Sequence, residues 1–224
     1  MKKSYCFISV IFALLAMSAC TADELTYSCN KDVDGWVKDN LTEIHEMTRS
    51  EWLKMDEGVS IAVYRAFTPD QKIRFWQEKF IEVKNLPWNA EELKHIELAE
   101  QFLNTHQDYF DEGKLSDEQL DEVETFSYKW IRTGIEQLGW DDAVVISIVM
   151  TGFKVKNTKG EVIRPISSYS DLIMGISTEY DCNCNTGTLN LCFLSQETCI
   201  DFHCVEVDKG CGLFLLYTCN GRCV

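Results

Sequence analysis

The fold of this chain is decided by residues 182–224, which read CNCNTGTLNLCFLSQETCIDFHCVEVDKGCGLFLLYTCNGRCV. Eight of the eleven cysteines lie in these 43 residues, a density typical of small domains held together by disulfides. A segment this short cannot bury enough apolar surface to fold without cross-links or a metal. We therefore predict a small disulfide-rich β module in which eight cysteines form disulfides: Cys182, Cys184, Cys192, Cys199, Cys204, Cys211, Cys219 and Cys223.

A bound metal is the alternative to disulfides in such a segment. Zinc ribbons use C-x-x-C pairs, which residues 182–224 lack, and His203 is the only imidazole among them. The spacing therefore favours disulfides and predicts no metal site. Cys182 and Cys184 are too close to bridge each other comfortably, so each needs a distant partner. The sequence does not choose among the possible pairings.

Three stretches of the module are rich in β-branched, aliphatic and aromatic residues and favour a small three-stranded sheet. The expected strands are 188–193, 200–207 and 213–218, with turns at 208–210 and 220–221. The run Leu213–Tyr217 is unusually apolar for so small a module. It either packs against the rest of the protein or forms an exposed patch that contacts a partner or a membrane. We expect packing, because it compensates for the small core of the module.

The N-terminus decides the expected compartment. Lys2 and Lys3 precede the apolar stretch Phe7–Met17, which has the length of a signal peptide, and small residues lead directly to Cys20. We predict a lipoprotein signal peptide over residues 1–19 and lipidation of Cys20, which anchors the chain to a membrane of the bacterial cell envelope, periplasmic or surface-exposed. Secretion with cleavage after Ala22 is the alternative. Export suits the module, because disulfides persist in oxidising compartments.

Between these two ends, we expect a tether over residues 20–30, a helical domain over 31–153 and a connecting region over 154–181. The helical domain is predicted as a bundle of five to six helices, the last of them a buried helix within 141–153. Helix starts are indicated by capping residues at Asp32, Thr48-x-x-Glu51, Thr68-Pro69, Asn89-x-x-Glu92 and Ser116-x-x-Gln119. Breaks between helices are expected at Gly58, Gly113 and Gly139, and the core is expected around Trp36, Trp52, Trp76 and Trp130.

The helix that begins at Thr68-Pro69 is predicted to be amphipathic. Its apolar positions recur at spacings of three and four residues: Ile73, Trp76, Phe80 and Val83. Its other face is expected to be solvated, because it carries charged residues: Lys72, Arg74, Glu78, Lys79 and Glu82.

The few histidines indicate no catalytic or cofactor site. His45-Glu46 lacks the second histidine of a zincin, and Glu92-x-x-His95 lacks the second such pair that a di-iron site needs. His106 is expected to be a satisfied core residue. We therefore predict no catalytic residues and no small-molecule cofactor. The formal net charge of −15 repels phosphate backbones, so nucleic acid is not an expected partner.

The cysteine count leaves one cysteine to be placed outside the module. Removal of Cys6 with the signal peptide and lipidation of Cys20 leave nine cysteines, and an odd number cannot all pair within one chain. Cys29 is far from the module in sequence. It is expected to be a small buried apolar residue.

Three short motifs resemble the myxobacterial bacteriocin fulvocin C: Asp-Cys182-Asn-Cys184, Gly210-Cys211-Gly212 and Cys219-Asn220-Gly221. The stretch Val63–Lys72, with Trp76 and Lys79, is similar to the N-terminal region of the fulvocin C-related protein family. The resemblance implies a helical region joined to a bacteriocin-like module and a role in antagonism between bacteria, with the envelope of a competitor as target. The alternative is a non-toxic envelope protein that uses the module for binding or adhesion.

Overall fold

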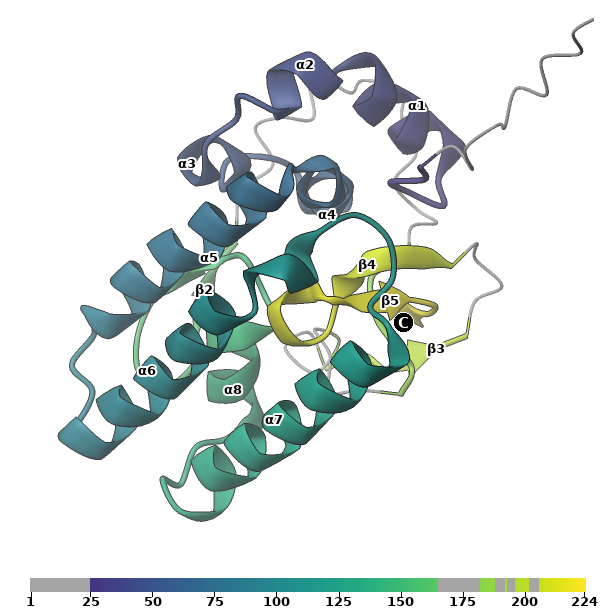
Figure 1. The fold of residues 1–224 in the computed structure, drawn as a ribbon. Coiled ribbons are helices and arrows are strands. Elements are labelled where there is room, and N and C mark those ends of the chain that lie inside the picture. Colours follow the sequence, from purple (N-terminus) through teal and green to yellow (C-terminus); the bar gives the residue numbers. More distant parts are fainter. Residues whose placement is uncertain (1–24, 165–181, 188–191, 193–195, 202–205) are drawn as a thin grey trace, which may run out of the picture.

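The computed structural model describes residues 25–164, 182–187, 192, 196–201 and 206–224. Within these residues the chain forms eight α-helices and short strands near its C-terminus, which confirms the predicted fold class (Figure 1). The helices are α1 (Lys31–Asp39), α2 (Leu41–Ile44), α3 (Arg49–Trp52), α4 (Glu57–Ala66), α5 (Pro69–Lys84), α6 (Ala90–Thr105), α7 (Asp117–Glu136) and α8 (Asp142–Val149), with a 3₁₀ turn η1 (Gln107–Phe110) after α6.

Capping residues fix most of the helix starts, as predicted. Capping boxes are present at the starts of α3, α5, α6 and α7. In each of them, the side chain of the cap residue and that of the third helical residue accept from each other's backbone N–H groups. Two expectations were wrong. Asn30, not Asp32, caps α1, because its carboxamide oxygen accepts from the N–H groups of Asp32 and Val33. Gly58 does not separate helices but lies in the first turn of α4, whose cap is Asp56.

The long helix expected up to Gly113 ends earlier, at Thr105. His106 caps its C-terminus: Nδ1 lies 2.8 Å from the Phe102 carbonyl oxygen and Nε2 lies 3.0 Å from Glu122 Oε1. The His106 side chain is therefore satisfied by these two oxygens, as expected, but it is half-buried and lies outside the core. Gly113 adopts φ +84° in the loop that follows η1.

The predicted buried helix after residue 141 is confirmed as α8, whose Val144–Val149 are all buried. Phe153 lies beyond its end. A short antiparallel hairpin then joins β1 (Lys154–Val155) to β2 (Val162–Ile163) within the expected connecting region. This hairpin was not predicted, because each of its strands has only two residues.

In the described part of the C-terminal segment the strands form antiparallel pairs. The expected strand 188–193, apart from Cys192, and residues 202–205 of the expected strand 200–207 lie outside the described residues. β3 (Cys199–Ile200) pairs with β6 (Arg222–Cys223), and β4 (Val207–Cys211) pairs with β5 (Tyr217–Cys219), both antiparallel. The expected turn 208–210 is part of β4, whereas 220–221 does separate β5 from β6. The expected strand 213–218 begins instead as the 3₁₀ turn η3 (Leu213–Leu215).

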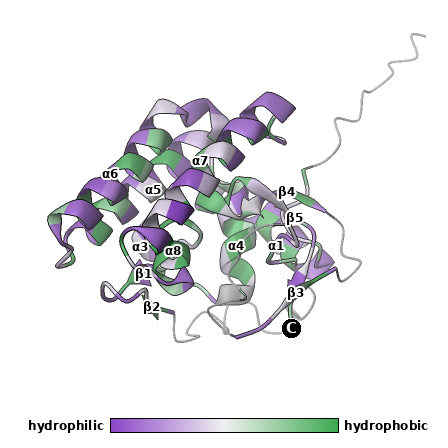
Figure 2. Cartoon of the chain, turned by 90° about the horizontal axis from the view of Figure 1, so that it is seen from below, coloured by the Kyte–Doolittle hydropathy of each residue, from purple (hydrophilic) through white to green (hydrophobic). Residues whose placement is uncertain are grey.

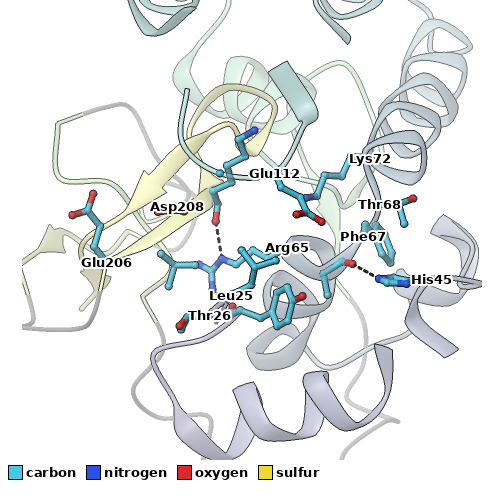
Figure 3. A pocket seen from close by; sticks show the side chains of 15 residues that line it. Leu25, Thr26, His45, Arg65, Phe67, Thr68, Lys72, Glu112, Glu206 and Asp208 are labelled. Atoms are coloured by element: carbon cyan, nitrogen blue, oxygen red, sulfur yellow. Dashed lines mark hydrogen bonds between the residues drawn. The ribbon is translucent and has the colours of Figure 1, made fainter. Parts of the chain in front are cut away.

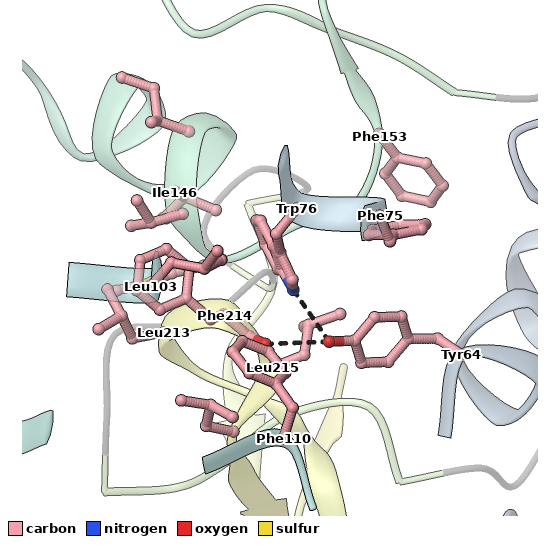
Figure 4. Close-up of a cluster of buried hydrophobic side chains, with 14 of the residues drawn as sticks. Tyr64, Phe75, Trp76, Leu103, Phe110, Ile146, Phe153, Leu213, Phe214 and Leu215 are labelled. Carbon is pink, nitrogen blue, oxygen red and sulfur yellow. Dashed lines mark hydrogen bonds between the residues drawn. The ribbon is translucent and has the colours of Figure 1, made fainter. Parts of the chain in front are cut away.

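The apolar run Leu213–Tyr217 packs against the helices, as expected, and fills the centre of the protein core. All five of its residues are at most 7 % exposed and belong to the same buried cluster as the helical core. The Phe214 ring lies 5.3 Å from Trp76 and 6.1 Å from Phe80, measured between ring centroids (Figure 4). In Figure 1 this yellow loop lies among the long helices α5, α6 and α7, with α8 beside it. The cysteine-rich segment and the helices thus share one core.

The sides of the helices that face outwards are largely hydrophilic, and their apolar residues face inwards (Figure 2). Trp52, Trp76 and Trp130 are buried core residues as predicted, whereas Trp36 is only partly buried. The expected solvated face of α5 is wrong at two positions: Lys72 is 5 % exposed and Lys79 is fully buried. That face is covered because later parts of the chain, including η1 and β1, pack over α5.

Candidate binding site

The disulfides of the C-terminal segment join its strands to one another. Cys184 pairs with Cys199, Cys192 with Cys223, and Cys211 with Cys219. Cys182 is also disulfide-bonded, and Cys204 lies outside the described residues. The Sγ atoms of Cys184, Cys192 and Cys199 lie within 4.8 Å of one another. Here they belong to two neighbouring disulfides.

Cys29 lies beside the segment although it is 153 residues away from Cys182 in sequence. Its Sγ atom is 3.4 Å from Cys182 Sγ and accepts a hydrogen bond of 2.9 Å from the Cys182 backbone N–H. The start of the described chain is therefore held against the start of the module.

Buried cations attach the C-terminal half of the chain to the first helices. Lys79 Nζ donates to the carbonyls of Thr151 and Phe153, and Arg49 donates to the Gly152 carbonyl and pairs with Glu82 at 2.9 Å. Burial lowers the pKa of Lys79 well below its ordinary value. Hydrogen bonds to carbonyl oxygens offset part of the desolvation cost of a buried cation. These contacts therefore hold residues 151–153 against α3 and α5.

Arg65 is the cation that fixes the module itself. Its guanidinium donates to three carbonyl oxygens, those of Tyr27, Cys182 and Lys209, each at 2.8 Å. Gly210 permits this approach, because a Cβ there would lie 2.5 Å from Arg65 Nε. Gly212, at φ +66°, similarly leaves room for the Tyr217 ring. The Gly210-Cys211-Gly212 motif thus has a packing role at each glycine.

A cavity of about 240 Å³ opens beside Arg65, between the helical body and the module (Figure 3). Its walls come from residues 25–27, the end of α4, the start of α5, the loop after η1, and β4. His45 also lines it, with Nε2 3.1 Å from the Ala66 carbonyl oxygen. The cavity therefore exists only when both parts of the chain are in place.

Two lysines bring positive charge to this cavity. Lys209 reaches the end of η1, where its Nζ donates to the carbonyls of Tyr109 and Asp111. Lys72 comes from the first turn of α5, and in Figure 3 its side chain extends towards Glu112. The pKa of each lysine is lowered to about 8, mainly by burial. For Lys72 the charge of Lys209 contributes to this lowering, and Glu112 opposes it.

His95 and Glu92, which form the incomplete di-iron motif, make structural contacts in the core. His95 stacks on Trp130 with ring centroids 4.8 Å apart, and its Nε2 lies 2.9 Å from the Trp130 carbonyl oxygen. Burial lowers the His95 pKa. Glu92 accepts from Trp140 Nε1 at 3.0 Å. These groups form an aromatic core layer.

Lys72 and Arg65 were not predicted as site residues. A charged residue within an otherwise apolar helical stripe was the available signal, since Lys72, Trp76, Lys79 and Val83 follow helical spacing. The predicted signal peptide and Cys20 lie outside the described residues. None of the described helices has both the length and the apolar character needed to cross a membrane.

No family model matches the chain, and no match is found among curated proteins or among solved structures.

Proposed function

We propose that this chain is an exported, lipid-anchored protein of the bacterial cell envelope whose cysteine-rich segment acts as a binding element while attached to the helical body. The burial of Leu213–Tyr217 in the common core carries this proposal. Releasing the segment would expose these five side chains and would remove two of the three carbonyls that Arg65 binds, those of Cys182 and Lys209. The cavity beside Arg65 supplies a recognition site that depends on both parts.

Antagonism between bacteria is the second candidate function. It is favoured by the disulfide-bonded C-terminal segment together with the resemblance of its motifs to fulvocin C. In that case the helical body would restrain the apolar run until the segment is released against the envelope of a competitor.

Immunoblotting of cells and medium with an antibody to the C-terminus separates the two functions. The attached binding protein predicts a full-length, membrane-associated band, which moves to the soluble fraction when Cys20→Ser removes the lipidation site. A Cys6→Ser variant is the matched control and should stay with the membrane. A short C-terminal fragment in the medium that inhibits related bacteria would instead support the toxin.

A further inference from the structure

Lys72 differs from every other buried cation in the described part of the chain. Arg49, Arg65, Lys79 and Lys209 all donate to backbone carbonyls. Lys72 is just as buried, at 5 % exposure, yet its Nζ makes no hydrogen bond or ion pair with any residue that the structure describes. Its Nζ lies 5.9 Å from the centroid of the Tyr64 ring.

A largely buried ammonium with no hydrogen bond or ion pair is costly, and Glu112 opposes that cost only as a nearby charge, so Lys72 is a candidate group for binding an anion. Lys72 lines the cavity, so an anionic group entering there would reach it. A carboxylate would supply the missing charge and hydrogen bonds.

The mouth of the same cavity is acidic. Glu112, Glu206 and Asp208 are all lining residues, and Glu206 and Asp208 share Lys114, at 3.2 and 3.8 Å. Glu112 is exposed and has no ion pair among the residues placed by the structure. A simple anion would be repelled by these carboxylates, whereas a ligand with both charges would satisfy Lys72 and Glu112 together.

The size of the cavity limits the ligand. About 240 Å³ is below the roughly 300–1,000 Å³ of sites for drug-sized ligands, so the occupant is a small molecule. Leu25, Phe67 and Val207 give the cavity an apolar wall that suits a short aliphatic chain. We propose that the cavity binds a small amino carboxylate, with its carboxylate on Lys72 and its ammonium on Glu112.

This inference names a ligand class for the proposed binding function, and it rests on that function only for its biological purpose. The test uses the purified, oxidised full chain rather than cells. Isothermal titration calorimetry at neutral pH and low salt would compare glycine, γ-aminobutyrate and ε-aminocaproate, which differ in charge separation. Caproate and hexylamine each carry one of the two charges. We expect saturable binding of at least one amino carboxylate and at least about tenfold weaker binding of the singly charged compounds.

Two variants test which residue binds the carboxylate of the ligand and which binds its ammonium. Lys72→Met should weaken binding of the best ligand by about 10- to 100-fold, the range for a hydrogen bond to a charged group. Glu112→Gln, on the surface, should weaken it by about two- to fivefold. The exposed Lys129→Met and Glu118→Gln are the matched controls and should change nothing.

Three results would overturn the proposal: no saturable binding of any amino carboxylate, equal affinity for caproate, or unchanged affinity in Lys72→Met. None of these results bears on whether the protein stays full-length on cells, so the proposed function and the ligand class fail separately.

Discussion

Tyr64 and Phe214 join the helical body to the cysteine-rich segment across 150 residues of sequence. The Tyr64 hydroxyl donates to the Phe214 carbonyl at 3.2 Å and accepts from Trp76 Nε1 at 2.9 Å (Figure 4). All three side chains are at most 1 % exposed. Phe214 and Leu215 also adopt positive φ values of 51° and 58°, which are unfavourable for large residues and persist where the surroundings fix them. The core therefore determines the conformation of the segment.

The Tyr64→Phe substitution tests this link. It removes the hydroxyl and leaves the buried Trp76 N–H and Phe214 carbonyl without their partner, so the free energy of unfolding should fall by about 1–3 kcal/mol. Urea unfolding followed by tryptophan fluorescence measures the change. The matched control is the exposed Tyr128→Phe, which should stay within about 0.5 kcal/mol of the wild type. Equal stability of both variants would show that the hydrogen bond contributes nothing.

Arg65→Met should loosen the module more than any single surface change. The substitution leaves three buried carbonyl oxygens without donors and should destabilise the protein by about 3–5 kcal/mol. Faster hydrogen exchange is expected around Lys209 and Cys182, the residues that Arg65 holds. Arg132→Met, an exposed arginine on α7, is the control. Exchange in β4 that stays at the wild-type rate in Arg65→Met would contradict this role.

Lys72 should make stability depend on pH in a defined window. Its pKa is about 8 in the folded protein and 10.5 ordinarily, so below pH 8 both states carry the charge and the folded state bears its desolvation cost. Between about pH 8 and 10.5 the unfolded chain binds more protons, so the free energy of unfolding rises with pH, by up to about 3 kcal/mol from this group. Lys209, Asp111 and Glu112 face the same region and stay present in all variants.

The Lys72→Met variant should therefore be more stable than the wild type at pH 7 by about 1–3 kcal/mol and should show a smaller rise between pH 7 and 9.5. Urea unfolding at both pH values, with the exposed Lys129→Met as control, measures this difference. A Lys72→Met protein that is less stable at pH 7 would mean that the lysine already has a stabilising partner.

Mass spectrometry of peptides from the unreduced protein determines the disulfide connectivity. Digestion of the exported protein without reductant should give linked peptides for Cys184–Cys199, Cys192–Cys223 and Cys211–Cys219. Closing the loop between Cys192 and Cys223 should stabilise the protein by about 3.7 kcal/mol and the shorter Cys211–Cys219 loop by about 2.5 kcal/mol on chain entropy alone. Paired Cys→Ala variants test this order. Stoichiometric zinc on reduced Cys184, Cys192 and Cys199 would replace the disulfide account by a metal site.

Local signals in the sequence predicted the helices well, because a capping box satisfies its own backbone within four residues. The start of α5 at Thr68-Pro69 and the start of α7 at Ser116 needed no tertiary information. The cysteine density likewise predicted the disulfide-bonded C-terminus.

The cap of α1 and the place of Gly58 were local errors, whereas the larger errors arose where distant segments meet. Lys72 and Lys79 have the polarity of a solvated face, and they are buried only because η1 and β1 pack over α5. The run Leu213–Tyr217 has the composition of a strand, but its place at the centre of the helices selects a tight turn in which the side chains point into one core. The candidate site was missed for the same reason, because its walls come from five separate parts of the chain.

Hydrogen exchange under native conditions tests most directly whether the cysteine-rich segment and the helical body form one unit. If they do, the amides of Leu215 and Leu216 open only with global unfolding, with the same protection as those in the middle of α5. Exchange of these amides at a much lower opening energy than α5, with α5 itself still protected, would show instead that the module is separable.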